Sequence, residues 1–190
     1  MRQDTKKHIV DAARKLFSEH SYLGVSMNDI AGKLNITKAA LYYHFTSKTK
    51  IYKKVLEEVF GNLTVKIKGS FNEETPDKKL RKLIQNYLDF GNKERNLTKM
   101  LTVKLSAVDP GIRQHTIKLR KRISNLIELA VREAVKDRKL VRESDSRYLT
   151  SLLTNTMDGI LLEYSFLNRK LNSKKMSNKI FGTLFPKVEV

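Results

Sequence analysis

The side chains best suited to chemistry gather in the N-terminal quarter of the chain, and their types suit the binding of a polyanion. Hydroxyls, amines and an imidazole can donate hydrogen bonds to phosphate oxygens or base edges, and a small residue among them allows close approach to a groove. Ser26 and Lys48 lie at expected helix starts, where free backbone N–H groups attract phosphate. The set comprises Ser26, Thr37, Lys38, Ala39, Tyr42, Tyr43, His44 and Lys48.

The sequence contains no catalytic constellation. The chain has no cysteine, which excludes disulfides, thiolate zinc sites and cysteine nucleophiles. The histidines show no metal-ligand spacing, and there is no glycine-rich phosphate loop, nucleophile elbow or pair of carboxylates. We therefore expect a protein that is not an enzyme and that holds neither a metal nor a cofactor.

The charge balance favours a polyanionic partner such as DNA, RNA or an anionic surface. The net charge is +18 over 190 residues, with a pI near 10.0, although a general bias toward lysine is an alternative cause. Residues 1–50 hold nine Lys/Arg against four Asp/Glu, so most of the excess lies in residues 51–190. No apolar run approaches the roughly 18 residues of a membrane span, and no signal-peptide pattern is present. We expect a cytoplasmic protein without a membrane partner.

The elements that carry these side chains are predicted to be all helical. Prolines are few, apolar residues recur at helical spacing, and no long stretch alternates apolar with polar residues. Ser26, Thr37 and Ser47 are typical N-caps, and Asp29 has the position of a capping-box acid. About nine helices are expected: over 4–20, after Ser26, after Thr37, over 48–68, from Pro76, and over 95–107, 110–138, 145–168 and 173–185.

The first three helices predict a helix-turn-helix. Two short helices joined by a tight turn, behind a longer supporting helix, place the second of the pair in the major groove of DNA. Asn35 tolerates the left-handed backbone that such a turn needs. We therefore expect a DNA-binding domain over residues 1–46 and a helical ligand-sensing and dimerisation domain over 47–190.

This segment resembles the DNA-binding domain of the TetR (tetracycline-repressor-like) family. The residues that carry the resemblance are Ile30-Ala31, Ile36-Thr37, Leu41-Tyr42, His44-Phe45 and Lys48, and it covers about residues 5–55. The family usually has glycine at the positions of Asn35 and Ala39, and the Ala39 methyl bears on sequence preference rather than on DNA binding.

The resemblance implies roles for individual residues. Base contacts fall to Thr37, Lys38, Ala39 and Tyr43. Phosphate contacts fall mainly to Ser26, Lys38, Tyr42, Tyr43, His44 and Lys48. Tyr42 is alternatively a packing residue with its hydroxyl turned outward.

A helix-turn-helix monomer has a small footprint, so we expect a two-fold dimer that reads two half-sites. The two C-terminal helices are the candidate interface, and the resemblance also implies a four-helix bundle there. The alternative is that their apolar residues form only the chain's own core. The predicted interface comprises Leu149, Leu152, Leu153, Thr156, Met157, Ile160, Ile180, Phe181 and Leu184.

The resemblance also implies a small-molecule effector bound between helices of residues 47–168. Candidate lining residues are Tyr87, Phe90, Met100, Leu101 and Met157, although residues of these types are more often plain core. From Arg113 to Arg142 there are ten Lys/Arg against three Asp/Glu. An anionic ligand such as an acyl-CoA is one hypothesis for this run, although such a run is more often a solvated helix face.

The resulting hypothesis is a dimeric regulator, a repressor by resemblance, that binds a palindromic operator and is released by a small molecule. The alternative is an architectural or weakly specific DNA-binding protein without an effector, because phosphate contacts alone give sequence-independent affinity.

Overall fold

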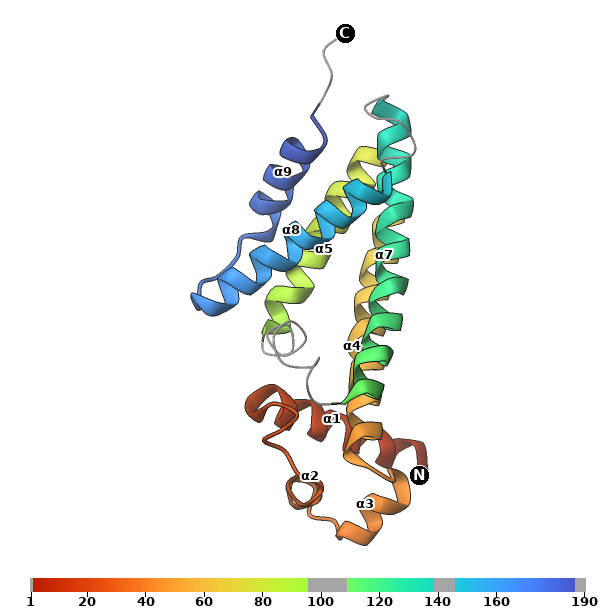
Figure 1. Cartoon of the computed structure of the whole chain (residues 1–190), viewed down its shortest axis with the longest axis vertical. Coiled ribbons are helices and arrows are strands. Elements are labelled where there is room, and N and C mark those ends of the chain that lie inside the picture. The colour runs from red at the N-terminus through yellow and green to blue at the C-terminus, as the bar shows by residue number, and fades with distance from the viewer. Residues whose placement is uncertain (1, 96–108, 139–145, 187–190) are drawn as a thin grey trace.

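The computed structural model describes residues 2–95, 109–138 and 146–186, and every regular element in these ranges is helical (Figure 1). The all-α prediction is confirmed. Met100, Leu101 and nearly all of the helix expected over 95–107 lie outside the described residues. The elements are α1 (Arg2–His20), α2 (Met27–Lys33), α3 (Lys38–His44), α4 (Lys48–Gly69), the short 3₁₀ helix η1 (Ser70–Asn72), α5 (Pro76–Lys93), α7 (Pro110–Arg138), α8 (Ser146–Phe166) and α9 (Ser173–Leu184).

The predicted caps set the starts of the short helices. The Ser26 hydroxyl accepts from the Asp29 amide at 3.2 Å while the Asp29 carboxylate accepts from the Ser26 amide at 2.7 Å, which is a complete capping box. Thr37 Oγ1 accepts from the Ala40 amide at 3.1 Å, and Ser47 caps α4 in the same way. Asn35 has φ 53°, the expected left-handed conformation of the turn between α2 and α3. Each cap contributes about 1 kcal/mol to helix stability.

Helices α1 to α3 and the first turns of α4 form one unit, here called the head. Its core holds Phe17, Ile30, Leu41, Ile51 and Tyr52, all fully buried. The rings of Phe17 and Tyr52 meet edge to face with centroids 4.9 Å apart, a favourable aromatic geometry. Figure 1 shows the head at one end of the molecule, with α4 running from it beside α7.

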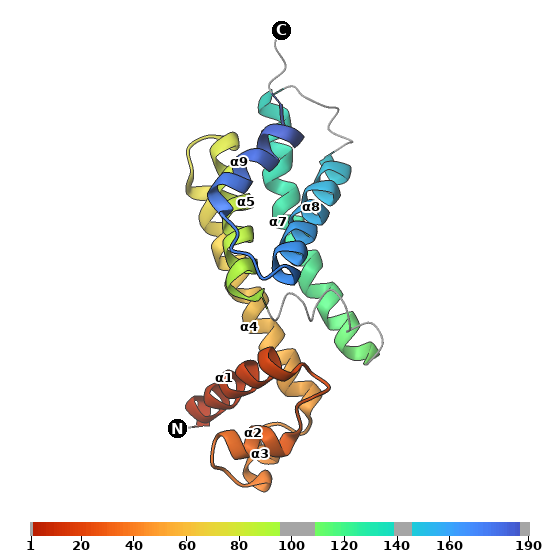
Figure 2. The ribbon, with the colours of Figure 1, turned by 90° about the vertical axis from the view of Figure 1, so that its left-hand side faces the viewer.

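The remainder of α4 packs with α5, α7, α8 and α9 into a second unit, here called the body (Figure 2). Leu80, Leu83 and Ile127 are fully buried in it. Helices α5 and α8 approach closely at Gly91, where an added Cβ would lie 2.2 Å from Leu161 Cδ1. The body therefore depends on close contacts between residues that are far apart in the chain.

Several residues predicted for the dimer interface lie inside the chain's own core. Leu153, Met157 and Phe181 are fully buried, and Ile180 is 5% exposed. The burial of these four side chains favours the alternative that they belong to the chain's own core, because a buried side chain is not accessible to a partner. Leu152 is 37% exposed, and the structure leaves Leu149, Thr156, Ile160 and Leu184 partly exposed.

Candidate nucleic-acid interface and effector groove

The outer face of α3 carries most of the predicted DNA-contacting residues. Leu41 is fully buried and fixes the helix on the head, so the residues on the other side face outward. Tyr42 is 42% and Tyr43 65% exposed, and Thr37, Lys38 and Ala39 are exposed as well. The sequence-based placement of these five residues on one accessible helix agrees with the structure.

This surface combines two small side chains with several polar ones. The exposed methyl groups of Ala39 and Ala40 leave space for close approach to a groove. The Lys38 ammonium lies 6.0 Å from the centre of the Tyr42 ring, and the Tyr43 and His44 rings meet edge to face at 5.2 Å. Amine, phenol and imidazole donors thus surround a small-residue centre, which is a chemistry that suits phosphates and base edges.

Ser26 is exposed at the start of α2, but its hydroxyl is already engaged in the capping box. Hydrogen bonds from the Ser26 backbone and side chain hold the pKa of Asp29 below its usual value, so this carboxylate stays charged. A negative charge therefore lies beside the residue that was expected to contact phosphate.

Lys48 is held by the chain itself. Its Nζ donates to the backbone carbonyls of Tyr22 at 2.9 Å and Val25 at 2.7 Å, and it lies 4.3 Å from the centre of the Tyr22 ring. Partial burial lowers the pKa of Lys48. An ammonium has three N–H groups, so one remains for a phosphate while the others tie the start of α4 to the segment between α1 and α2. No sequence spacing pointed to these carbonyls.

Two sets of side chains join the head to the body. The Tyr22 hydroxyl lies 2.9 Å from Thr49 Oγ1, which donates to Asp109 Oδ2 at 3.1 Å. Asp109 Oδ1 accepts from the Gly111 amide at 2.7 Å, so the same carboxylate caps α7. Burial alone would raise the pKa of Asp109, but these hydrogen bonds outweigh it and lower the pKa. An ion pair between Arg14 and Glu94 links α1 to the end of α5.

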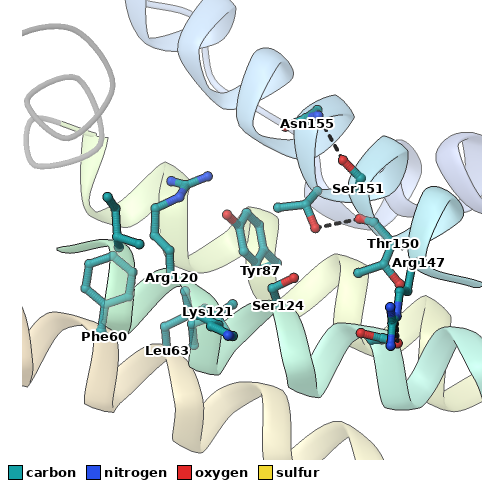
Figure 3. Close-up of a pocket in the computed structure, with 14 residues that line it drawn as sticks. Phe60, Leu63, Tyr87, Arg120, Lys121, Ser124, Arg147, Thr150, Ser151 and Asn155 are labelled. Carbon is teal, nitrogen blue, oxygen red and sulfur yellow. Dashed lines mark hydrogen bonds and ion pairs between the residues drawn. The ribbon is translucent and has the colours of Figure 1, made fainter. Parts of the chain in front are cut away.

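The body contains a groove of about 480 Å³ between α4, α5, α7 and α8 (Figure 3). Three cations line it, Arg120 and Lys121 from α7 and Arg147 from α8. Glu128, also in the lining, accepts from Arg132 at 2.6 Å and lies 3.7 Å from Arg147. Hydroxyls and apolar side chains complete the wall, among them Ser124, Thr150, Ser151, Phe60, Leu63 and Ile117.

A partly buried polar network lies at one edge of this groove. The Tyr87 hydroxyl donates to Asp158 Oδ1 at 2.5 Å, and Arg120 pairs with Asp158 Oδ2. Burial, reinforced by the Asp158 charge, raises the pKa of Tyr87 well above its usual value. Burial alone would lower the pKa of Arg120, but Asp158 more than offsets this and raises it. The network therefore keeps a neutral phenol, a carboxylate and a guanidinium together, and it joins α5, α7 and α8.

Of the predicted effector residues that the structure describes, only Tyr87 lines the groove. Phe90 and Met157 are buried in the core, and Met100 and Leu101 lie outside the described residues. The basic run of residues 113–142 contributes Arg120 and Lys121, whereas Arg147 and the α8 hydroxyls were not predicted. Their only sequence signal is a polar face on a helix, which by itself does not show which neighbour that face meets.

Two further features, a metal site and a membrane-spanning helix, are absent from the described residues. No group of three His, Cys, Asp or Glu side chains in these ranges is placed to hold a metal ion. No helix in the same ranges is both long enough and apolar enough to cross a membrane.

A three-helix head with an exposed second short helix defines a helix-turn-helix DNA-binding protein, and the family follows from comparison. The profile of bacterial regulatory proteins of the tetR family matches residues 9–55, and that of the tetracyclin repressor-like C-terminal domain matches residues 73–162. The chain belongs to the TetR family and is a DNA-binding transcriptional regulator.

Relatives resemble the two units to different extents. The biofilm operon icaADBC negative transcriptional regulator IcaR of Staphylococcus epidermidis is 47% identical over 56 residues, which is 30% of this chain and 30% of that protein. The nucleoid occlusion factor SlmA of Haemophilus influenzae is 27% identical over 171 residues, covering 84% of this chain and 74% of SlmA. The high identity to IcaR is thus limited to a segment the size of the head.

Solved structures resemble the whole chain. A candidate regulator of fatty acid metabolism from Clostridium perfringens superposes with a TM-score of 0.76 at 26% identity, covering 96% of this chain and 99% of that one. FadR of Bacillus subtilis, solved with stearoyl-CoA, gives a TM-score of 0.82 at 18% identity, covering 96% and 99% of the two chains. The second likeness establishes the shared fold.

Proposed function

We propose that this protein is a homodimeric repressor that binds a palindromic operator and releases it when an anionic small molecule of the acyl-CoA class occupies the groove. The observation that carries the DNA-binding part is the exposed face of α3, with small residues at its centre and donors around it. Repression is supported by the identity of the head segment to IcaR, a negative regulator.

A dimer follows from the size of the head and from the exposed face of α8. One recognition helix covers few base pairs, and helix-turn-helix proteins gain affinity by reading two half-sites. Tyr148, Leu152 and Phe166 are 70%, 37% and 63% exposed, and they share one stripe of α8 with Thr156 and Gly159. Large apolar side chains aligned on one exposed stripe are typical of an interface.

The groove has the two chemistries that an acyl-CoA requires. Arg120, Lys121 and Arg147 suit phosphate groups, and Phe60, Leu63 and Ile117 suit an apolar portion. The fold shared with FadR, which was solved with stearoyl-CoA, supports this ligand class. The Clostridium perfringens relative, a candidate regulator of fatty acid metabolism, supports it as well.

Release requires that the ligand favour a conformation with low DNA affinity. An anion that binds Arg120 competes with Asp158 for the guanidinium and so weakens the network that joins α5, α7 and α8. Helix α7 begins at the Thr49–Asp109 junction with the head and reaches the groove within the same helix. A change in the position of α7 therefore reaches the DNA-binding unit through a rigid element.

The test begins with selection of bound sequences from random duplex DNA, followed by titration of the selected complex with palmitoyl-CoA. We expect enrichment of a palindrome and its release by palmitoyl-CoA. Arg120→Gln should need at least about tenfold more palmitoyl-CoA for release, since it loses a charge-assisted contact. Lys136→Gln, on α7 but outside the groove, serves as the matched control.

Two outcomes would count against the proposal. Tight, salt-sensitive binding without sequence enrichment would indicate the architectural alternative, which the net charge of +18 favours. An enriched palindrome that palmitoyl-CoA does not release would exclude this ligand class.

A further inference from the structure

A second, smaller pocket lies between α4 and α7, on the opposite side of α7 from the groove. Its volume is about 280 Å³, and α7 contributes His115, Lys118 and Arg122 to its wall. These positions recur at helical spacing on one face, whereas the groove is lined by residues 117, 120, 121 and 124 on the other face. Phe60 of α4 lines both cavities and separates them.

The cations of this pocket are not neutralised by the chain. Lys118 and Arg122 are exposed, lie one turn apart, and form no ion pair with any residue in the described ranges. Glu57 is the one carboxylate in the wall. It already pairs with Lys54, whose Nζ donates to Glu57 Oε2 at 3.2 Å. The lining of this partly open pocket therefore keeps a positive balance.

A buried polar atom in the same pocket lacks a hydrogen bond. His115 Nε2 is buried and has no hydrogen-bond partner among the described residues, although it lies 3.5 Å from Glu57 Oε1. A buried polar group without a partner costs free energy that a ligand can recover. Gly61, also in the lining, is exposed, and a Cβ added there would meet no atom within 4 Å.

We propose that the α4–α7 pocket binds a small phosphate-bearing anion, independently of the effector groove. Lys118 and Arg122 supply charge-assisted hydrogen bonds, and His115 Nε2 supplies a third polar contact from the wall. The absence of a side chain at Gly61 leaves room for the phosphate, and Phe60 and Leu119 offer an apolar surface to a small organic substituent. Free phosphate and a phosphate monoester share this chemistry and differ in use of the apolar surface.

The experiment is calorimetric titration of the full chain with inorganic phosphate and with phenyl phosphate at fixed ionic strength. We expect one site per chain. Tighter binding of phenyl phosphate than of inorganic phosphate would indicate that the physiological anion is an ester. Equal affinities would indicate free phosphate. The double variant Lys118→Gln, Arg122→Gln should bind at least about tenfold more weakly. Gly61→Leu, which fills the space while favouring the helix, should bind neither anion and retain its melting temperature.

Lys136→Gln provides the matched control, because it removes the same charge from α7 outside both cavities. Equal weakening in this variant, or undiminished binding in Gly61→Leu, would show charge screening and overturn the proposal.

Titration in the presence of palmitoyl-CoA separates the two sites. Phosphate binding without an acyl-CoA response would reject only the proposed effector, and an acyl-CoA response without phosphate binding would reject only this pocket.

Discussion

The head and the body use polar side chains in different ways. In the head, Ser26, Thr37 and Ser47 each bond a backbone amide three residues away, so the contacts are local. In the body, Asp158 on α8 binds Tyr87, 71 residues earlier, and Arg120, 38 residues earlier. A local contact can be inferred from spacing along one element, whereas a distant one exists only after helices have packed. The comparison predicts that single body contacts matter more for stability than single caps do.

The largest expected effect is that of Asp158→Ala. The change leaves the buried Tyr87 hydroxyl and the Arg120 guanidinium without their shared acceptor, which should lower the free energy of unfolding by about 3 kcal/mol. Chemical denaturation measures it. Asp158→Asn keeps an acceptor and should cost less, and equal losses in the two variants would show that an uncharged acceptor cannot replace the carboxylate.

Lys48→Ala comes next, because it links the two kinds of contact. Loss of two bonds to carbonyls should lower the free energy of unfolding by about 1 to 2 kcal/mol. It should also weaken binding to all DNA sequences and reduce the slope of log affinity against log salt by about one, since one phosphate contact is lost. Unchanged stability with a reduced salt slope would mean that the ammonium serves DNA alone.

Thr37→Ala should have a smaller effect on stability. Removal of the α3 cap should cost about 1 kcal/mol in the free energy of unfolding and should change preference among operator sequences. Thr37→Ser keeps the capping oxygen and so separates the two roles. A loss from Thr37→Ala larger than that from Asp158→Ala would show that a local cap in the head matters more for stability than a distant contact in the body.

The smallest expected effect concerns pH. Because the folded pKa of Asp109 lies below the ordinary aspartate value of 3.8, its contribution to stability is complete above that pH and is lost as pH falls through the folded pKa. Asp109→Asn should therefore flatten the decline in melting temperature between about pH 5 and pH 2. The effect should be slight, since this carboxylate is only partly buried and solvent screens its interactions. An identical decline in melting temperature at acid pH in both proteins would exclude a role for this carboxylate.

The predicted helices of the head agree with the structure to within a few residues at their ends, because each prediction rests on a short-range rule. The capping box of Ser26 and Asp29 and the left-handed Asn35 need only their own neighbours. Apolar spacing likewise predicted the helix from Pro110 and the one over 145–168, which the structure shows as α7 and α8. It could not say which apolar faces were internal, since Leu153 and Leu152 both satisfy the pattern of a packing residue.

The sequence by itself determined the all-α class, the helix-turn-helix and the outward residues of α3, since helical periodicity and caps act within a few residues. Only the tertiary structure decided that Lys48 bonds Tyr22 and Val25 and that Arg147 reaches the groove. It also decided which face of α7 meets which cavity. These outcomes depend on how helices distant in sequence pack, and packing reflects the combined shape and burial of many side chains. No single segment of the chain encodes it.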